Sequence, residues 1–236
     1  FISGGDLGDI IRGGDGFECF RKGVAICDDV VRRWPARTAA YAARGAGRCH
    51  LGEAEFARGL DPSATYRLAL EDFDHALAAG PGFAGTLCDR AVVWLRIGQA
   101  ALKSGGEPQA SLTRAIEDLD AALGSHPGHA RALFLRAETR LLQGELRLAA
   151  GEDPLPDWRQ GIADYDGTLA VDPRWLEPWE HRGILHFHVG SLEAIGGIAA
   201  GESLRRAEAD LRYVVARGRP LARFPLASVL QIQGKY

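Results

Sequence analysis

The sequence predicts an all-α fold, a superhelical solenoid of helix hairpins, on two observations. The first is repetition, because five sets of residues recur every 46 positions. These residues are Asp72, Asp118, Asp164 and Asp210; Pro35, Pro81, Pro127 and Pro173; Arg44, Arg90, Arg136 and Arg182; Gly52, Gly98, Gly144 and Gly190; and Gly13, Gly59, Gly105, Gly151 and Gly197. The second is helical periodicity within each period, with no strand-like alternation. A fixed period of about 20 to 50 residues indicates stacked units that bury their apolar faces against each other.

Each period divides into two helices, as its third copy illustrates. Residues 131–150, RALFLRAETRLLQGELRLAA, are mostly strong helix formers, and Gly151 follows them. In the segment GIADYDGTL, residues 161–169, the apolar and small residues recur at i, i+1, i+4, i+7 and i+8. We expect Asp157 to cap this second helix at its start and Pro173 to follow its end.

The period assigns the whole chain, residues 1–236, to one solenoid. The predicted parts are the end of a truncated first helix at 1–13, a second helix at 14–35, full repeats at 36–81, 82–127 and 128–173, a fourth repeat at 174–220, and a truncated first helix at 221–236. We therefore expect an interior piece of a longer solenoid. Its uncapped apolar ends offer a route to self-association.

Composition narrows the class of protein. The formal net charge of −3, with dispersed Lys and Arg, argues against a nucleic-acid partner. No apolar stretch approaches the length of about 20 residues that spans a bilayer, so we expect no membrane partner. Four cysteines without a CxxC pair predict reduced thiols and a cytoplasmic location. The absence of Met indicates that the numbering opens inside a longer polypeptide.

These repeats resemble the tetratricopeptide repeat (TPR) over essentially the whole chain. In the first helix the large residues near the start are Tyr41, Leu87, Leu133 and Trp179, and the small residues four positions later are Gly45, Ala91, Ala137 and Gly183. In the second helix the small residues are Gly23, Ala69, Ala115, Gly161 and Ala207, and the large ones are Cys27, Phe73, Leu119, Tyr165 and Leu211. The Gly set that begins at Gly52 matches the turn glycine of the family. Because the family repeat has about 34 residues, the extra dozen after this glycine predict two further helical turns, and hence tetratricopeptide-like hairpins with extended first helices.

The repeated aspartates raise the question of an active site or a cation site. A catalytic pair should occur once, whereas these carboxylates recur at each period, and an arginine precedes each by 28 residues. We expect structural ion pairs, with Asp166 as an alternative partner for Arg136: Arg44–Asp72, Arg90–Asp118, Arg136–Asp164 and Arg182–Asp210. A carboxylate that neutralises an arginine is not free to act as an acid or base. We therefore expect no catalytic residue, no metal and no cofactor, with a peptide- or metal-binding role of these carboxylates as the alternative.

The resemblance implies that the first helices line an inner face that receives peptides or partner helices. The partner-binding residues it implies are Ala42, Ala46, Cys88, Val92, Phe134, Glu138, Glu180, Ile184 and Phe187. The Lys and Asn residues with which one TPR subtype clamps a C-terminal carboxylate are missing here, so such a clamp is disfavoured. Two alternatives stay open: the face takes an apolar helix or segment, or the longer helices bury it against neighbouring repeats.

Three further motifs favour structural roles. GPGFAG at 80–85 has the spacing of a phosphate-binding loop but no preceding strand, so we interpret it as a turn between helices. The histidines in HRGILHFH, at 181–188, lack the supporting acid or Cys of a metal site. Cys49 and His50 have no charged partner nearby in sequence that would generate a thiolate nucleophile.

The function predicted from these observations is a protein-interaction scaffold that binds a peptide or partner protein and is not an enzyme. The alternative is a regulatory or substrate-recruiting segment of a larger bacterial enzyme. The repeats are similar to TPR arrays found in bacterial serine/threonine kinase polypeptides. None of the kinase signatures occurs in this sequence, so on this alternative phosphoryl transfer would reside outside it.

Overall fold

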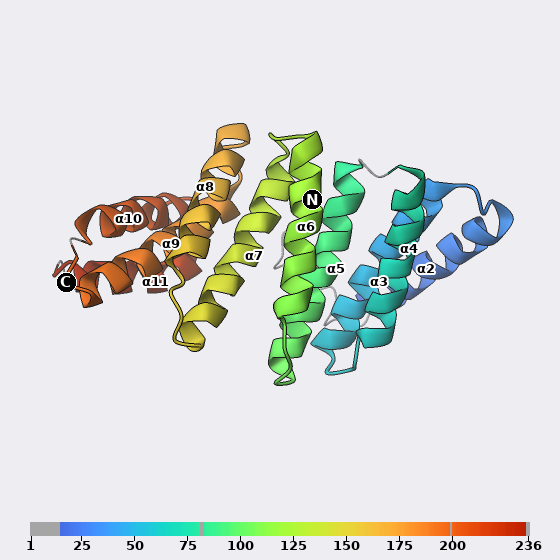
Figure 1. Cartoon of the computed structure of the whole chain (residues 1–236), viewed down its shortest axis with the longest axis horizontal. Coiled ribbons are helices and arrows are strands. Elements are labelled where there is room, and N and C mark those ends of the chain that lie inside the picture. The colour runs from blue at the N-terminus through green and yellow to red at the C-terminus, as the bar shows by residue number, and fades with distance from the viewer. Residues whose placement is uncertain (1–14, 81–82, 199, 235–236) are drawn as a thin grey trace. The chain divides into compact units, whose positions relative to one another are not determined.

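The computed structural model describes residues 15–80, 83–198 and 200–234, and within these ranges the chain is helical and forms no strand (Figure 1). The helices are α2 Asp15–Arg33, α3 Thr38–Ala57, α4 Ser63–Ala79, α5 Ala84–Lys103, α6 Gln109–Ser125, α7 Ala130–Ala149, α8 Leu155–Val171, α9 Leu176–Ile195, α10 Gly201–Val215, the 3-10 helix η1 Pro220–Ala222 and α11 Arg223–Ile232. They fall into two compact units, α2–α6 and α7–α11.

Within each unit, consecutive helices pack as antiparallel hairpins. In the first unit α3 pairs with α4 and α5 with α6, and in the second unit α7 pairs with α8 and α9 with α10. The first helix of each hairpin has 20 residues, whereas the second has 15 to 17. The predicted all-α fold of helix hairpins with extended first helices is therefore confirmed. The predicted helix end at 1–13 lies outside the described residues.

The first helices end in a Schellman motif, which accounts for the repeated glycines Gly59, Gly105, Gly151 and Gly197. Gly151 follows α7 with a φ of +77°, and its N–H donates to Leu148 O at 3.0 Å. The next N–H, of Glu152, donates to Arg147 O at 2.8 Å. Gly59 terminates α3 with the same pair of hydrogen bonds and a φ of +75°. This left-handed conformation favours glycine because other residues pay a steric cost there.

The second helix α8 starts earlier than the sequence predicts, so the expected cap at Asp157 is wrong. Pro154 and Pro156 begin the helix two residues before this position, since proline is favoured in the first turn, where its missing N–H costs nothing. Asp153 Oδ1 instead accepts from the N–H of Leu155 at 3.0 Å. Asp157 lies inside the first turn, and its carboxylate oxygen is 2.6 Å from Nε of Arg147.

The glycine set that begins at Gly52 lies inside the first helices and not in a turn. A Cβ atom on Gly52 would lie 2.4 Å from Cε1 of Tyr66, and one on Gly144 would lie 2.2 Å from Nε1 of Trp158. Both aromatic rings are almost fully buried. Glycine is therefore required because the large side chain of the second helix rests directly on the backbone of the first.

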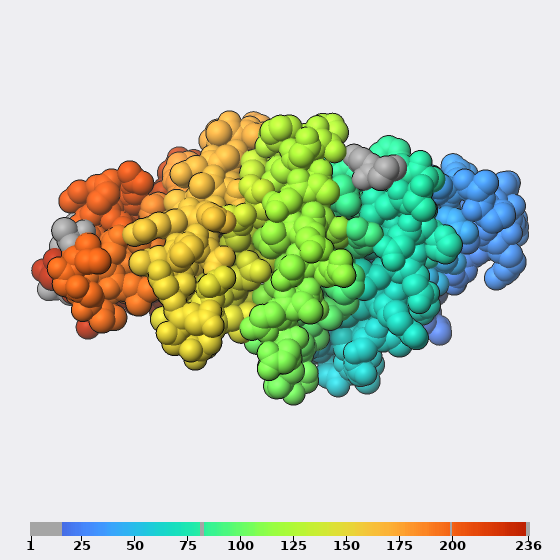
Figure 2. All heavy atoms as spheres, viewed as in Figure 1, coloured from blue at the N-terminus to red at the C-terminus, as the bar shows by residue number. Residues whose placement is uncertain are grey.

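The apolar core of each unit fills the space between its hairpins. In the first unit one buried cluster is Cys49, Tyr66, Ala69, Phe73 and Val93, and in the second unit another is Ala137, Trp158, Tyr165, Leu185 and Val189. The small residues at the TPR-like positions, such as Ala69 and Ala137, have no exposed surface. In the space-filling view, side chains fill the spaces that the ribbons leave between neighbouring helices of the first unit (Figure 2).

The substitution Gly52→Ala is expected to lower the free energy of unfolding by about 1–3 kcal/mol, because the new methyl group overlaps Tyr66. Gly124→Ala is the matched control in α6, where a Cβ meets nothing within 4 Å. The control should raise the free energy of unfolding by up to about 1 kcal/mol, the helix propensity difference. Urea denaturation of the three proteins measures both effects, and an equal shift in the two variants would contradict this account of the glycine set.

Candidate functional site

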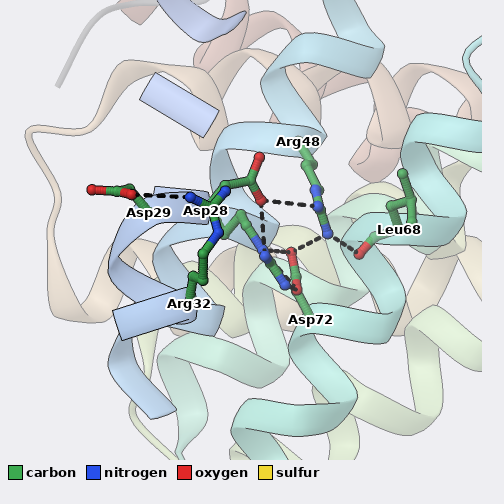
Figure 3. Close-up of polar contacts among 7 residues, drawn as sticks. Asp28, Asp29, Arg32, Arg48, Leu68 and Asp72 are labelled. Atoms are coloured by element: carbon green, nitrogen blue, oxygen red, sulfur yellow. Dashed lines mark hydrogen bonds and ion pairs between the residues drawn. The ribbon is translucent and has the colours of Figure 1, made fainter. Parts of the chain in front are cut away.

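Asp72 of α4 receives two arginines of α3 (Figure 3). Arg44 Nη2 donates to Asp72 Oδ1 at 2.6 Å, and Arg48 Nη1 donates to Asp72 Oδ2 at 2.7 Å. Arg44 Nη1 also reaches Asp28 Oδ1 of α2 at 2.8 Å, and Arg48 donates to the carbonyl of Leu68 at 3.1 Å. These charges therefore join α2, α3 and α4.

The pair of Arg44 and Asp72 recurs in the other three hairpins. The Nε and Nη2 groups of the arginine both donate to the aspartate, at 2.9 and 2.5 Å in Arg90–Asp118, 2.9 and 2.6 Å in Arg136–Asp164, and 2.8 and 2.8 Å in Arg182–Asp210. All eight predicted ion-pair residues thus meet in the expected combinations. Two parallel hydrogen bonds make each pair both strong and geometrically specific.

A second aspartate contacts three of these arginines, 16 residues before each in the chain. Arg90 Nη1 lies 2.6 Å from Asp74, and Arg182 Nη1 lies 2.6 Å from Asp166, as Arg44 does from Asp28. Asp166, the alternative partner expected for Arg136, therefore pairs with the arginine of the following hairpin. In the Asp-x-Asp motif, the first aspartate pairs with the arginine of its own hairpin. The second aspartate, at Asp74 and Asp166, pairs with the arginine of the following hairpin.

The buried aspartates of this set have no capacity left for acid or base catalysis. Their side chains are 2 to 8% exposed, and each carries a bidentate arginine. Hydrogen bonding with Asp72 raises the pKa of Arg44, and hydrogen bonding with Asp118 raises the pKa of Arg90. The contact therefore favours the charged form of these two arginines.

The predicted partner-binding residues of the first unit are only partly accessible. Cys88 is completely buried in α5, because its side chain enters the hairpin core, and it cannot contact a partner. Ala46 and Val92 are half-buried and pack against the cluster that contains Tyr66 and Phe73. Ala42 is half-buried on α3. This face therefore offers an apolar strip that consists of the half-buried residues Ala42, Ala46 and Val92.

In the second unit the predicted residues take part in a polar cluster between α7 and α9. Glu138 of α7 lies 2.5 Å from Nδ1 of His181 on α9 and accepts a hydrogen bond from the buried hydroxyl of Tyr165. The ring of Phe134 packs against His181, with 5.9 Å between ring centroids. Burial opposes protonation of His181, but the hydrogen bond and charge of Glu138 outweigh it and raise the pKa of His181. Glu138 and His181 therefore form a hydrogen-bonded pair beside the ring of Phe134.

The remaining predicted residues lie on α9. Glu180 lies 2.5 Å from Nε of Arg219, whose Nη1 also lies 2.7 Å from Glu177. Ile184 and Phe187 are half-buried and pack against the core cluster of α10 and α11. These three positions of α9 thus contribute to packing within the second unit.

Sequence reasoning missed the ion pairs that join neighbouring first helices. Glu53 of α3 lies 2.6 Å from Nε of Arg96 on α5, and His50 contacts the same glutamate at 3.0 Å. The Glu138–His181 pair makes the same kind of connection between α7 and α9. Both pairs are 43 residues apart, but they occupy different positions of the repeat, so no repeated residue signals them.

The other motifs have no site geometry. Within the described ranges, no three His, Cys, Asp or Glu side chains lie close enough together to hold a metal. His188 Nδ1 is buried without a hydrogen-bond partner among the described residues, and burial lowers the pKa of His188. The GPGFAG segment connects α4 to α5, and two of its residues, 81 and 82, lie outside the described ranges. None of the helices that the structure describes is long and apolar enough to cross a membrane.

Solved structures of tetratricopeptide repeat proteins share this fold at low sequence identity. A TPR protein from Parabacteroides merdae aligns with 96% of this chain and 70% of its own, with a TM-score of 0.58 and 17% identity. A thermophilic TPR protein of Thermus thermophilus aligns over 95% and 96%, with a TM-score of 0.57 and 16% identity. The MamA protein aligns over 91% and 92%, with a TM-score of 0.53 and 14% identity. No protein-family model and no curated protein matches the sequence. The likeness establishes a tetratricopeptide-type fold.

The variant Asp118→Ala is expected to lower the free energy of unfolding by about 3 kcal/mol, because it leaves the buried end of Arg90 without its bidentate partner. Asp74→Ala removes the other carboxylate on the same arginine, which is 65% exposed, and should cost less than about 1 kcal/mol. Chemical denaturation of both variants tests the assignment. Equal losses would show that burial does not decide the strength of these pairs.

A pH dependence is expected from His186, which is buried in α9. Burial, with smaller contributions from Arg182 and Arg206, lowers the pKa of His186 from 6.5 to about 4. A folded pKa below the unfolded value means that its contribution to stability is complete above pH 6.5 and is lost as the pH falls towards 4. The loss amounts to about 3 kcal/mol. His186→Leu should flatten the stability profile between pH 6.5 and 5, whereas replacing the exposed His126 should leave the slope unchanged.

Proposed function

We propose that this protein is a non-catalytic protein-interaction scaffold whose first helices present the binding face. The observation that supports this most directly is the state of the repeated carboxylates. The buried aspartates are each neutralised by an arginine in the described residues, so the most regular chemical feature of the chain serves to join helices. The tetratricopeptide-type fold supports the same proposal, since stacked helix hairpins form extended binding surfaces.

The first-helix face is held rigid by charge pairs before any partner arrives. Glu53–Arg96 joins α3 to α5, and Glu138–His181 joins α7 to α9. A face ordered in advance loses less conformational entropy when it binds, which favours affinity for a given contact area. We infer that a partner lies across the half-buried apolar strip of this face and does not enter a deep groove. A helix or extended segment with small apolar side chains fits such a strip.

In each unit, the proposed surface consists of those predicted residues of that unit that retain exposed area. They are Ala42, Ala46, Val92, Phe134, Glu138, Glu180, Ile184 and Phe187. Cys88 is left out because it is completely buried. The missing Lys and Asn residues make a C-terminal carboxylate an unfavourable ligand for this face.

A cytoplasmic setting is part of the proposal. The four cysteines form no disulfide within the described residues, and two of them, Cys49 and Cys88, are buried. Reduced buried thiols suit a reducing compartment. That the chain is the regulatory segment of a larger bacterial enzyme such as a serine/threonine kinase stays a prediction from the sequence. The intact mass of the parent polypeptide in its own cells tests it.

A photo-crosslinking amino acid at Ala46 or Val92 is expected to capture one and the same protein. The matched controls are Glu71 of α4 and Glu117 of α6, which are exposed on second helices and are also one period apart. Crosslinks should form at the first-helix positions and not at the controls, and the unlabelled protein should compete for them. Crosslinks confined to Glu71 and Glu117 would contradict the proposed face. Unchanged thermal unfolding of each labelled protein is the control for folding.

A further inference from the structure

A pocket of about 560 Å³ lies in the first unit, away from the first-helix strip described above. It is formed by the last turns of α3 and α5, the loop that begins at Gly59, and the start of α4. Its walls are mainly carbon, from Phe56, Leu60, Tyr66, Leu70 and Ile97. This volume falls within the range of about 300–1,000 Å³ that is typical of small-molecule sites. The extra helical turns that distinguish this repeat from the ordinary TPR therefore create a cavity.

Two cations border this apolar pocket, and the described residues give neither of them an ion pair. Arg67 and Lys103 both line it. Lys103 Nζ lies 4.4 Å from the ring centroid of Phe56. The pocket's own carboxylate, Asp61, is engaged, because its Oδ1 accepts hydrogen bonds from the N–H and Oγ of Ser63 at 3.0 and 2.6 Å. The pocket thus combines an apolar wall with two cations and one carboxylate, which leaves an excess of positive charge in its lining.

The equivalent place in the second unit shows what the pocket lacks. Two periods further along the chain, Arg159 stands at the position of Arg67, and Glu193 stands at the position of Ala101. Arg159 Nη2 lies 3.8 Å from Glu193 Oε1, and Ser203 Oγ donates to the other oxygen of Glu193 at 2.8 Å. The second unit therefore supplies a carboxylate to its arginine from within the chain.

Two further differences between the units concern volume. Trp158 replaces Tyr66, and Leu192 replaces Ala100, so larger apolar side chains occupy the equivalent region of the second unit. In the first unit, Ala100 and Ala101 are both part of the pocket lining. The first unit thus has small residues at both positions, and one of them, Ala101, stands where the second unit has the carboxylate of Glu193.

We propose that this pocket binds a small amphipathic carboxylate, with an apolar body against Phe56, Tyr66 and Ile97 and its carboxylate on Arg67 and Lys103. The ligand carboxylate takes the role that Glu193 has in the second unit. Charge complementarity is specific to the pocket, because the protein as a whole has a net charge of −3 and does not attract anions in general. This inference is independent of the proposed scaffold function, because the α3 and α5 residues of the proposed binding face do not line the pocket.

The experiment is an isothermal titration calorimetry measurement, in which decanoate is added to the full chain at concentrations at which decanoate is monomeric. Decanol, which has the same tail without the charge, is the matched ligand. The key variant is Ala101→Glu, which installs the carboxylate of the second unit. We expect this variant to fold, because the second unit already has a glutamate, Glu193, at the equivalent position. Circular dichroism measures whether the helical content of the variant is unchanged. Arg67→Ala removes an exposed side chain, and Arg159→Ala is its matched control in the second unit.

We expect saturable binding of one decanoate per chain. Binding should weaken by about tenfold or more for decanol, for Arg67→Ala and for Ala101→Glu, because each removes or satisfies a charge-assisted contact. Arg159→Ala should bind decanoate as tightly as the unaltered chain. Absence of saturable decanoate binding would overturn the proposal. So would equal affinity for decanoate and decanol, or decanoate binding that survives both Arg67→Ala and Ala101→Glu.

Discussion

The buried ion pair between the two helices of each hairpin is the constraint on which the rest of the structure depends. Removing a guanidinium and a carboxylate from water is costly unless they meet with good geometry. Arg44 and Asp72 satisfy this condition with two parallel hydrogen bonds, and the side chain of Asp72 is only 2% exposed. Because Asp72 also accepts from Arg48 at 2.7 Å, two arginines of α3 converge on one carboxylate of α4 and fix the register of the two helices. Asp28 extends the same constraint to α2.

The register set by these pairs determines where the helices can approach closely. With Arg44 opposite Asp72, the ring of Tyr66 comes to rest on Gly52, two turns further along α3. The same relation places Trp158 on Gly144 beside the Arg136–Asp164 pair. Arginine and glycine therefore recur together, because the arginine fixes the register of the two helices and the glycine leaves room for the aromatic ring that this register brings against the first helix. Beyond Gly52, α3 continues to Ala57, and these added residues, with the loop that follows them, border the pocket.

The sequence was most informative about contacts that form in the same way in each hairpin. The hairpin fold and the extended first helices were predicted correctly, because the same contact has to form in each hairpin and so leaves a residue at a fixed interval. The Arg–Asp combinations were expected for the same reason. The start of α8 was not, since Asp157 is an ordinary capping residue by type and only the flanking prolines shift the helix start.

The parts of the site that could not be predicted are those in which one hairpin differs from the others. Glu138 has Ala46 and Val92 at the equivalent positions of the first unit, so its pair with His181 leaves no repeated pattern. The burial of Cys88 was also unpredictable, because its neighbours at equivalent positions, Ala42 and Phe134, are half-buried. Helical periodicity identifies the face on which a residue lies. It does not show how deeply the next helix covers that face.

This contrast indicates where function resides in a repeat protein of this kind. A residue that recurs in each hairpin makes the same internal contact there, as Asp118 does with Arg90. Its hydrogen-bonding groups are used by that contact. A residue that departs from the period is free of that requirement. Ala101 and Glu193 occupy equivalent positions, and the change between them alters both the volume and the charge available to Arg67 and Arg159. The repeated residues therefore define the helical fold, and the residues that depart from the repeat account for the differences between the two units.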